Sequence, residues 1–352
     1  MSSLDNPPRS LDSPPHEEVV LSESGNMFPA DVVWKVNLLI AFTIWIILMN
    51  GLLVLGLLKR KDRRNNTYNF HIINLAMTDF LFGCTVLPVK VDMFVNDEWN
   101  FGAEICQFWL MIDKLLTTVS ILIVLVLVAE GSVDLAIPDL SPGSTLPLWA
   151  VLIAGPWIIG AAFIIPFFLL RADFSNIPDC RAQFSDLEFV IPLVTFIVPA
   201  AVVLCLALVI IIMLFLQRPP AAIIHSQERR KTVRQQTTAS CVISVVFVLM
   251  WAPYGVTQFL SSLNLGSHPS FNLMLWVAYA NSAITPLLWL ILPDVRRGFR
   301  DMCCCCCYCC CRSSDPESMP RLDGSSMRVI ENKYFVSGRL SNIQEHESQT
   351  FV

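Results

Sequence analysis

Long apolar stretches alternate with short polar segments along most of this chain. Seven of them carry few charged residues, and they lie at 36–58, 70–94, 103–129, 147–170, 187–217, 237–263 and 271–292. Each exceeds the roughly 20 helical residues needed to cross about 30 Å of hydrocarbon. Transmembrane strands would instead show about ten residues of alternating polarity. The pattern predicts an all-α membrane protein, a seven-transmembrane helix bundle.

The segments on either side of the bundle have different characters. Residues 1–35 are rich in Pro, Ser and acidic residues, a composition that favours disorder. A short amphipathic segment at 294–302 predicts an eighth helix on the membrane surface. The predicted organisation is a disordered N-terminus at 1–35, the bundle and eighth helix at 36–302, and a tail with a cysteine cluster at 303–352.

Composition and charge agree with this reading. Hydrophobic residues make up 54% of the chain and charged residues 15%, against about 25% charged in soluble domains. A net charge of -5 argues against nucleic-acid binding. Lys and Arg gather at 59–64, 218–234 and 296–312, which predicts an extracellular N-terminus and a cytoplasmic C-terminus in the plasma membrane. The loop at 132–146 should also be cytoplasmic, yet it contains no Lys or Arg.

The cysteines suggest two kinds of chemistry. Cys106 and Cys180 both fall on the predicted outer side, where we expect a disulfide that ties the long fourth loop to the bundle. The cysteines that follow the seventh stretch lie beside arginines in a reducing compartment, which favours S-palmitoylation and contact with membrane lipid. A zinc site is the alternative, although contiguous cysteines lack the usual ligand spacing. The cluster consists of Cys303, Cys304, Cys305, Cys306, Cys307, Cys309, Cys310 and Cys311.

Four ionisable residues stand out within the predicted helices: Asp79, Asp113, Lys114 and Glu130. Charges inside a membrane are costly, so such residues are candidates for function. Asp113, Thr117 and Ser120 are spaced by four and three residues, which puts them on one helical face. A carboxylate on that face suits an ammonium ligand. The alternative is an internal ion pair with Lys114, whose long side chain can reach back to Asp113.

Aromatic residues lie at matching depths in the last two stretches. Trp251 and Tyr254 occupy the sixth, and Trp276 and Tyr279 the seventh. Aromatic faces around a carboxylate can hold a cation by cation–π attraction. Ordinary core packing is the alternative explanation for any one of them.

Several motifs in order make a family resemblance specific. They are Asn50, Asn74-Leu75-Ala76-x-x-Asp79, Trp99-x-Phe101-Gly102 before Cys106, Phe247-x-x-x-Trp251-x-Pro253 and Asn281-Ser282-x-x-x-Pro286. With these motifs the chain resembles the rhodopsin-like (class A) G-protein-coupled receptors. Asp113 together with Trp276-x-x-Tyr279 resembles the aminergic branch. The stretches Phe108-Trp109-Leu110 and Trp251-Ala252-Pro253-Tyr254 look most like histamine receptors.

The resemblance implies roles for these residues. Asp113 would be the counter-ion of a small-molecule amine, on the same face as Thr117, and Thr195 would bond the far end of the ligand. Trp251 would be an aromatic switch below a cage formed by Tyr254, Trp276 and Tyr279. The acidic residue expected in the fifth stretch of the most similar histamine receptors is missing, which leaves histamine itself in doubt.

A second site also follows from the resemblance. No resident cofactor is expected, apart from an allosteric sodium ion, which the family holds with a carboxylate and neutral oxygens. The matching residues here are Asp79, Ser120, Asn281 and Ser282. A hydrogen-bonded network around water would use the same residues.

The predicted cytoplasmic half departs from the family. The acidic-Arg-aromatic triplet reads Glu130-Gly131-Ser132, the fifth-helix tyrosine position reads Ala207, and Asn-Pro-x-x-Tyr becomes Thr285-Pro286-Leu287-Leu288-Trp289. Polar groups that the family brings together on activation are therefore absent. We expect an atypical, orphan-like receptor with weak or altered coupling to heterotrimeric G proteins.

The altered cytoplasmic half also fits a protein that does not signal. A non-signalling decoy or heteromer partner is the alternative, tethered through its tail, because Thr350-Phe351-Val352 fits the terminal pattern that PDZ domains bind. An enzyme is not expected, since no nucleophile-base pair or metal-ligand set appears. A transporter is also disfavoured, because no paired broken helices are evident.

Overall fold

The computed structural model describes residues 19–21, 27–59, 67–96, 98–136, 146–173, 180, 183–184, 188–216, 224–263, 265 and 271–306. Structural statements below concern these residues. Residues 1–302 form one compact unit, and 303–352 a second.

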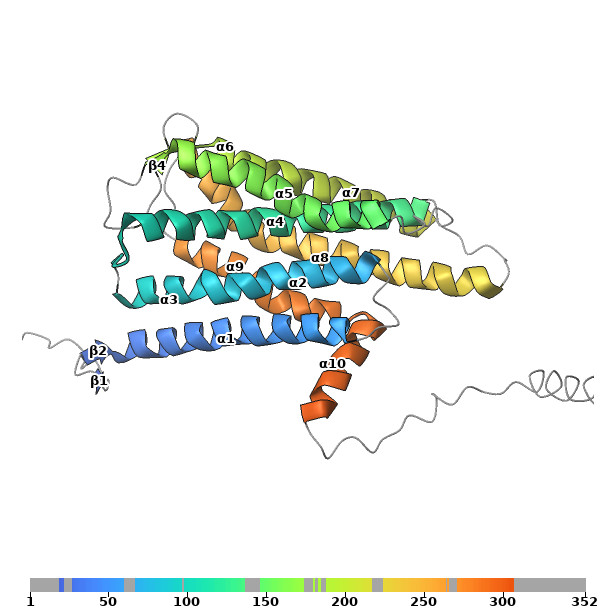
Figure 1. The fold of residues 1–352 in the computed structure, drawn as a ribbon, viewed down its shortest axis with the longest axis horizontal. Helices are drawn as coiled ribbons and strands as arrows, with labels where there is room; N and C mark the ends of the chain where they lie inside the picture. The colour runs from blue at the N-terminus through green and yellow to red at the C-terminus, as the bar shows by residue number, and fades with distance from the viewer. Residues whose placement is uncertain are drawn as a thin grey trace, which may run out of the picture. The chain divides into compact units, whose positions relative to one another are not determined.

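Within the first unit, long helices run side by side (Figure 1). The helices are α1 (Ala30–Leu58), α2 (Thr67–Thr85), α3 (Leu87–Asn96), α4 (Gly102–Ala136), α5 (Leu146–Arg171), α6 (Val190–Pro192), the π-helix η2 (Leu193–Ile197), α7 (Val198–Leu216), α8 (Ile224–Ser262), α9 (Phe271–Trp289) and α10 (Pro293–Cys306). Two short antiparallel ribbons pair β1 (Val19–Leu21) with β2 (Met27–Pro29), and β3 (Ala172–Asp173) with β4 (Gln183–Phe184).

By length and composition, six of the described helical runs could cross a membrane. A seventh is α9 when it is taken together with α10, which turns from it by 95°. Each run overlaps one of the predicted apolar stretches. The prediction of an all-α bundle with a short eighth helix is confirmed.

Prolines explain two departures from straight helices. The second stretch breaks at Val86 into α2 and α3, because Pro88 cannot donate a backbone hydrogen bond and clashes with the preceding turn. In the fifth stretch the N–H of Val198 bonds to the carbonyl of Leu193, five residues earlier, just before Pro199. A wider turn at this point removes the need for the N–H that Pro199 lacks.

Some helices are longer than the apolar pattern indicated. α1 starts at Ala30 rather than at 36, and α8 at Ile224 rather than at 237. α4 is 35 residues long and continues through Gly131 to Ala136. Apolarity marks where a helix meets hydrocarbon, but backbone hydrogen bonds continue into water. The β1–β2 ribbon and residues 30–35 of α1 lie in the segment expected to be disordered, whose remaining residues are outside the described part.

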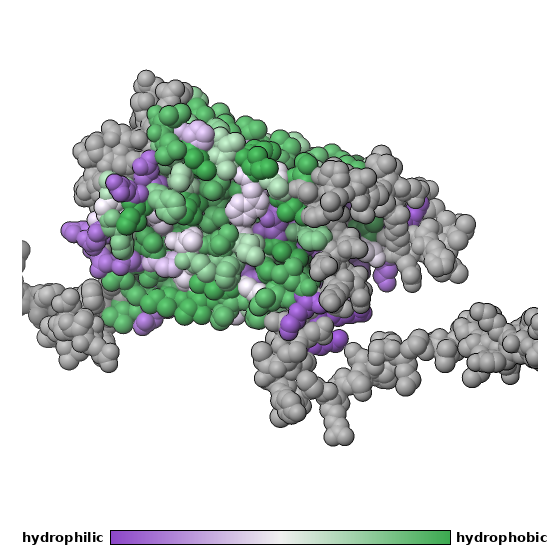
Figure 2. Space-filling model, viewed as in Figure 1, coloured by the Kyte–Doolittle hydropathy of each residue, from purple (hydrophilic) through white to green (hydrophobic). Residues whose placement is uncertain are grey.

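The interior and the exterior of the bundle are both apolar. Buried residues include Leu53, Ile72, Val124 and Phe247, while Leu170 and Phe215 are among many large apolar side chains exposed on the outside. Figure 2 shows apolar residues over much of the visible helix surface. An outer surface of this kind suits lipid rather than water.

Candidate ligand-binding site

Asp113 lies inside the bundle on α4, toward the end that carries the disulfide. The residue is 6% exposed. The hydroxyl of Tyr279 on α9 donates to Asp113 Oδ1 across 3.4 Å. The helical spacing seen in the sequence therefore turns this carboxylate inward, where α9 meets it.

Lys114 forms the internal ion pair that the sequence left open. Its Nζ lies 3.6 Å from Asp113 Oδ2. It also donates to the hydroxyl of Tyr254 across 3.2 Å and lies 5.4 Å from the centre of that ring. The lysine thus reaches from α4 to α8, and the carboxylate is already paired within the chain.

The four predicted aromatic residues form one connected cluster beside this pair. Ring centres are 6.2 Å apart for Trp251 and Tyr254, 6.3 Å for Trp251 and Tyr279, and 5.7 Å for Trp276 and Tyr279. Phe82 on α2 adds a ring 4.8 Å from that of Tyr279, which the sequence reasoning missed. The ring planes of these four pairs are inclined by 64–84°, close to edge-to-face, and such packing fixes the ring positions.

The two threonines have local hydrogen bonds. Thr117 donates to the carbonyl of Asp113 across 2.8 Å, and Thr195 donates to that of Ile191 across 2.7 Å. Thr195 lies in η2 and is 8% exposed. Since each hydroxyl uses its proton on the backbone, what remains for a ligand is an acceptor oxygen.

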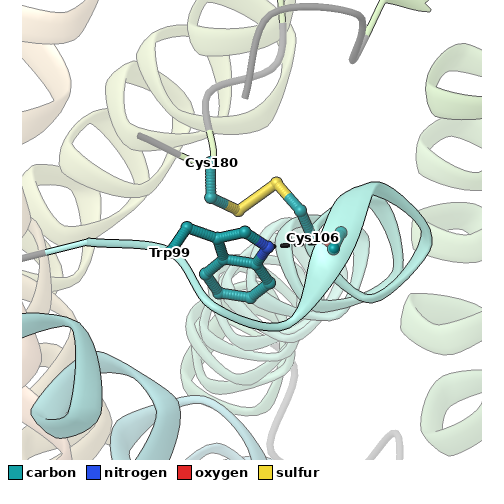
Figure 3. Close-up of a disulfide and its surroundings, with 4 residues drawn as sticks. Trp99, Cys106 and Cys180 are labelled. Carbon is teal, nitrogen blue, oxygen red and sulfur yellow. Dashed lines mark hydrogen bonds between the residues drawn. A yellow bond between two sulfur atoms is a disulfide. The ribbon is translucent and has the colours of Figure 1, made fainter. Parts of the chain in front are cut away.

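The predicted disulfide between Cys106 and Cys180 is present, with Cα atoms 5.5 Å apart. Figure 3 shows the ring of Trp99 beside it, with Trp99 Nε1 donating to the carbonyl of Gly102 across 2.7 Å. The bond joins the start of α4 to the loop between β3 and β4. It therefore holds Cys180 at the end of the bundle nearest Asp113.

Below the aromatic cluster lies a small cavity of about 10 Å³. Its lining includes all four residues predicted for the sodium site: Asp79, Ser120, Asn281 and Ser282. Ser282 donates to Asp79 Oδ1 across 2.7 Å, whereas Asp79 Oδ2 is buried and has no hydrogen-bond partner among the described residues. A buried carboxylate oxygen facing neutral oxygens is a donor set that fits a small hard cation or a water molecule.

At the other end of the bundle, near α10, Glu130 pairs with a residue that the sequence reasoning missed. His71 Nε2 on α2 lies 2.9 Å from Glu130 Oε2, and the imidazole is fully buried. The contact is an ion pair when the imidazole is protonated, and neither atom has a hydrogen bond among the described residues. His71 lies near the start of the 70–94 stretch and belongs to none of the motifs quoted above. Only its polarity within a predicted membrane span could have signalled it.

Other residues that depart from the family's cytoplasmic motifs pack against neighbouring helices or bond within their own helix. The carbonyl of Gly131 accepts from Thr237 on α8 across 3.4 Å, and Ala207 on α7 is 1% exposed. Ser132 and Thr285 donate to the carbonyls of residues 128 and 281 in their own helices, at 2.8 Å each. None of these groups extends a long polar side chain toward its neighbours.

Trp289, which replaces the family's tyrosine, is fully buried. Its ring centre lies 6.0 Å from that of Tyr68 on α2, edge to face. Tyr68 in turn donates to the carbonyl of Gln236 across 2.9 Å and accepts from Ser240 across 3.1 Å. Tyr68 thus joins α2, α8 and α9 in one contact, and the sequence reasoning did not single it out.

Two predictions lie outside the residues whose side chains are described. These are the palmitoylation cluster from Cys303 onward and the PDZ-type terminus at Thr350, Phe351 and Val352.

Together, the seven-helix arrangement, the disulfide and the buried Asp113 define a membrane receptor of the seven-helix class. The model of the 7 transmembrane receptor (rhodopsin family) matches residues 49–289. The chain belongs to this family and is a multi-pass membrane protein. Its relatives are receptors, which confirms that it is not an enzyme.

The relatives confirm the resemblance to aminergic, and particularly histamine, receptors. The human histamine H2 receptor is 24% identical over 260 residues, covering 68% of this chain and 71% of that one. The mouse histamine H4 receptor is 34% identical over 100 residues, covering 28% of this chain and 25% of that one. The cat 5-hydroxytryptamine receptor 1B is 28% identical over 165 residues, covering 45% and 42%. The chain therefore spans a quarter of the histamine H4 receptor, 71% of the histamine H2 receptor and 42% of the 5-hydroxytryptamine receptor.

Proposed function

We propose that this protein is a cell-surface receptor for a small organic amine, with Asp113 as the counter-ion of the ligand ammonium. The observation that carries the proposal is the buried Asp113 carboxylate, held by Tyr279 beside a connected aromatic cluster. Such a cluster excludes water and offers ring faces to a cation. Histamine and 5-hydroxytryptamine, the compounds in the relatives' names, are both amines. The N-terminus would face outward, in line with the distribution of Lys and Arg.

Competition binding on the full-length receptor tests the amine proposal. Asp113→Asn keeps the size of the side chain and removes its charge, so amine affinity should fall by at least about tenfold. Glu104→Gln is the matched control, because Glu104 lies in the first turn of the same helix and is exposed. Amine binding that survives Asp113→Asn, or no amine binding at all, contradicts the proposal.

The second part of the proposal is weak or altered coupling to G proteins. An agonist acts through its different affinities for two states, so the balance of those states depends on the groups that join the helices. Here the α10 end is joined by the His71–Glu130 pair, the Thr237–Gly131 bond and the Tyr68–Trp289 contact. These contacts support a closed cytoplasmic end.

Gly131→Arg tests this part by restoring the family residue. A Cβ at 131 would lie 3.4 Å from Thr237 Cγ2, an ordinary contact, so Gly131→Ala fits and serves as the control for helix stabilisation. Agonist-driven nucleotide exchange should rise in Gly131→Arg and not in Gly131→Ala. Strong exchange by the wild-type receptor contradicts weak coupling.

The same closed end favours the alternative function of a non-signalling decoy or heteromer partner. Its tail would bring in PDZ-domain proteins and, through palmitoylation, membrane lipid. A receptor that binds amine and never activates a G protein, even with Gly131→Arg, would favour this alternative.

We also propose that the cavity at Asp79 takes a sodium ion, using Asp79, Ser120, Asn281 and Ser282. The unpartnered Asp79 Oδ2 supports this. Replacing sodium chloride by choline chloride should change agonist affinity in the wild type and leave Asp79→Asn unaffected. An identical salt response in both would instead favour a water network.

A further inference from the structure

The ion pair inside the candidate pocket points to a particular class of ligand. We propose that the ligand carries a carboxylate as well as an ammonium, in the manner of an α-amino acid, and that Lys114 binds the carboxylate. This inference rests on the proposed role of Asp113 and adds a second charged contact to it.

Charge balance is the first step. Lys114 Nζ lies 3.6 Å from Asp113 Oδ2, so the pocket already contains one positive and one negative side chain. A ligand with an ammonium alone would take over Asp113 and leave the lysine ammonium without a carboxylate inside the bundle. An unpaired buried charge is strongly unfavourable. A ligand with both charges gives each side chain a new partner, and the net charge of the site does not change.

Geometry is the second step. Asp113 is directed at Tyr279 on α9, whereas Lys114 extends to Tyr254 on α8. The two charges thus have separate supports on different helices. Lysine has a flexible four-carbon stem, so its ammonium can move aside by the width of an inserted group while staying near Tyr254.

The hydrogen-bonding groups around the pair are the third step. The side chain of Lys114 is 15% exposed and that of Asp113 8% exposed, so the pair is shielded from bulk solvent without being fully enclosed. The Tyr254 hydroxyl accepts from Lys114 and so holds the ammonium beside the aromatic cluster. An ammonium has three N–H donors and is suited to a carboxylate, since charge-assisted hydrogen bonds are about twice as strong as neutral ones.

Matched pairs of an amine and its parent amino acid test the inference directly. Histamine and histidine, tyramine and tyrosine, and tryptamine and tryptophan each differ by a single carboxylate. Binding is measured on the purified full-length receptor in lipid nanodiscs as the rise of the unfolding midpoint with ligand concentration, which gives Kd. At least one amino acid should bind the wild type more tightly than its amine does.

Variants of Lys114 then test whether this lysine binds the carboxylate of the ligand. Lys114→Met should weaken the amino acid by about tenfold to a hundredfold and strengthen the matched amine, whereas Lys114→Arg should keep the preference. Lys90→Met is the control, because Lys90 is a second lysine beside an aromatic ring, 5.4 Å from the centre of Trp109. If Lys114→Met fails to fold, the double variant Asp113→Asn with Lys114→Met leaves neither charge unpaired, and it should bind neither member of a pair.

The outcomes separate this inference from the proposed function. Amines that bind the wild type, are lost in Asp113→Asn and exceed their amino acids would overturn the inference and leave the amine receptor intact. Amines that bind only after Lys114→Met, when no amino acid binds the wild type, would also overturn it, because Lys114 would then only block Asp113 and would not bind a ligand carboxylate. Failure of every pair on every variant would overturn both.

Discussion

Gly255 on α8 lies so close to the ring of Phe196 in η2 that adding one methyl group at position 255 should destabilise the fold. A Cβ at position 255 would lie 2.3 Å from Phe196 Cδ1 and 2.5 Å from Cε1. Carbon atoms that are not bonded pack at about 3.5–4.0 Å. Gly255→Ala therefore requires the ring or the helix to move by more than an ångström, next to both Thr195 and Tyr254 of the candidate site.

The size of the effect follows from two opposing terms. Overpacking a tight contact typically costs about 1–3 kcal/mol. Alanine in place of glycine within a helix returns up to about 1 kcal/mol. The net loss should be about 1–2 kcal/mol. With about 2.1 cal/mol/K of unfolding entropy per residue over the 302-residue unit, this lowers the unfolding midpoint by about 2–3 °C.

The measurement is thermal unfolding of the purified full-length receptor in lipid nanodiscs at one fixed scan rate, since unfolding of large chains is often irreversible. Gly155→Ala in α5 is the matched control, because a Cβ there would meet nothing within 4 Å. That variant should be as stable as the wild type or slightly more so. Phe196→Leu removes the ring, and in its background Gly255→Ala should no longer destabilise.

Two results would refute the reasoning. If Gly255→Ala and Gly155→Ala have the same unfolding midpoint, the Phe196 ring moves aside without loss of stability. If the loss persists in the Phe196→Leu background, it does not come from the ring.

Three further substitutions have expected effects on stability, each checked by the same unfolding measurement. Tyr68→Phe removes the hydroxyl that joins α2 to α8 and should cost about 1 kcal/mol, while a larger loss would mean that the ring has also moved. Trp157→Phe leaves Asn74 Oδ1 without its donor at 2.8 Å and should cost about 1–3 kcal/mol, and an unchanged midpoint would contradict that bond. Replacing both Cys106 and Cys180 by serine opens a link across 74 residues and should cost up to about 4 kcal/mol, and reduction of the wild type should reproduce the loss.

Much of the fold could be predicted from the sequence because hydrocarbon imposes a simple rule. A helix that crosses lipid must be apolar over its length, so the seven stretches are visible in the residue pattern. Helix ends were less predictable. α8 begins thirteen positions earlier than the apolar stretch at 237, because polar residues such as Arg234 can continue a helix into water.

The sequence predicted which residues line the candidate site, but it did not predict that Asp113 and Lys114 form an ion pair there. Spacing placed Asp113 on an inward face, and matching depth brought Trp251 and Tyr279 together. Whether Lys114 would turn toward Asp113 could not be decided, since neighbouring residues point about 100° apart on a helix and a lysine can bridge or avoid that angle. The choice depends on Tyr254, a residue far along the chain that supplies the second contact.

Contacts at the α10 end of the bundle show whether the altered motifs simply lost the family's interactions or replaced them with others. Loss of function alone would leave these positions without matching contacts on other helices. Instead, Trp289 is fully buried against Tyr68, and Gly131 accepts a hydrogen bond from Thr237. Glu130, deprived of an adjacent arginine, lies 2.9 Å from His71. Trp289 Nε1 and both ring nitrogens of His71 are nevertheless buried without a hydrogen-bond partner among the described residues. Because Trp289, Gly131 and Glu130 each have a neighbour on another helix, this end still behaves as a packed interface, and a coupling change by Gly131→Arg would act against those contacts.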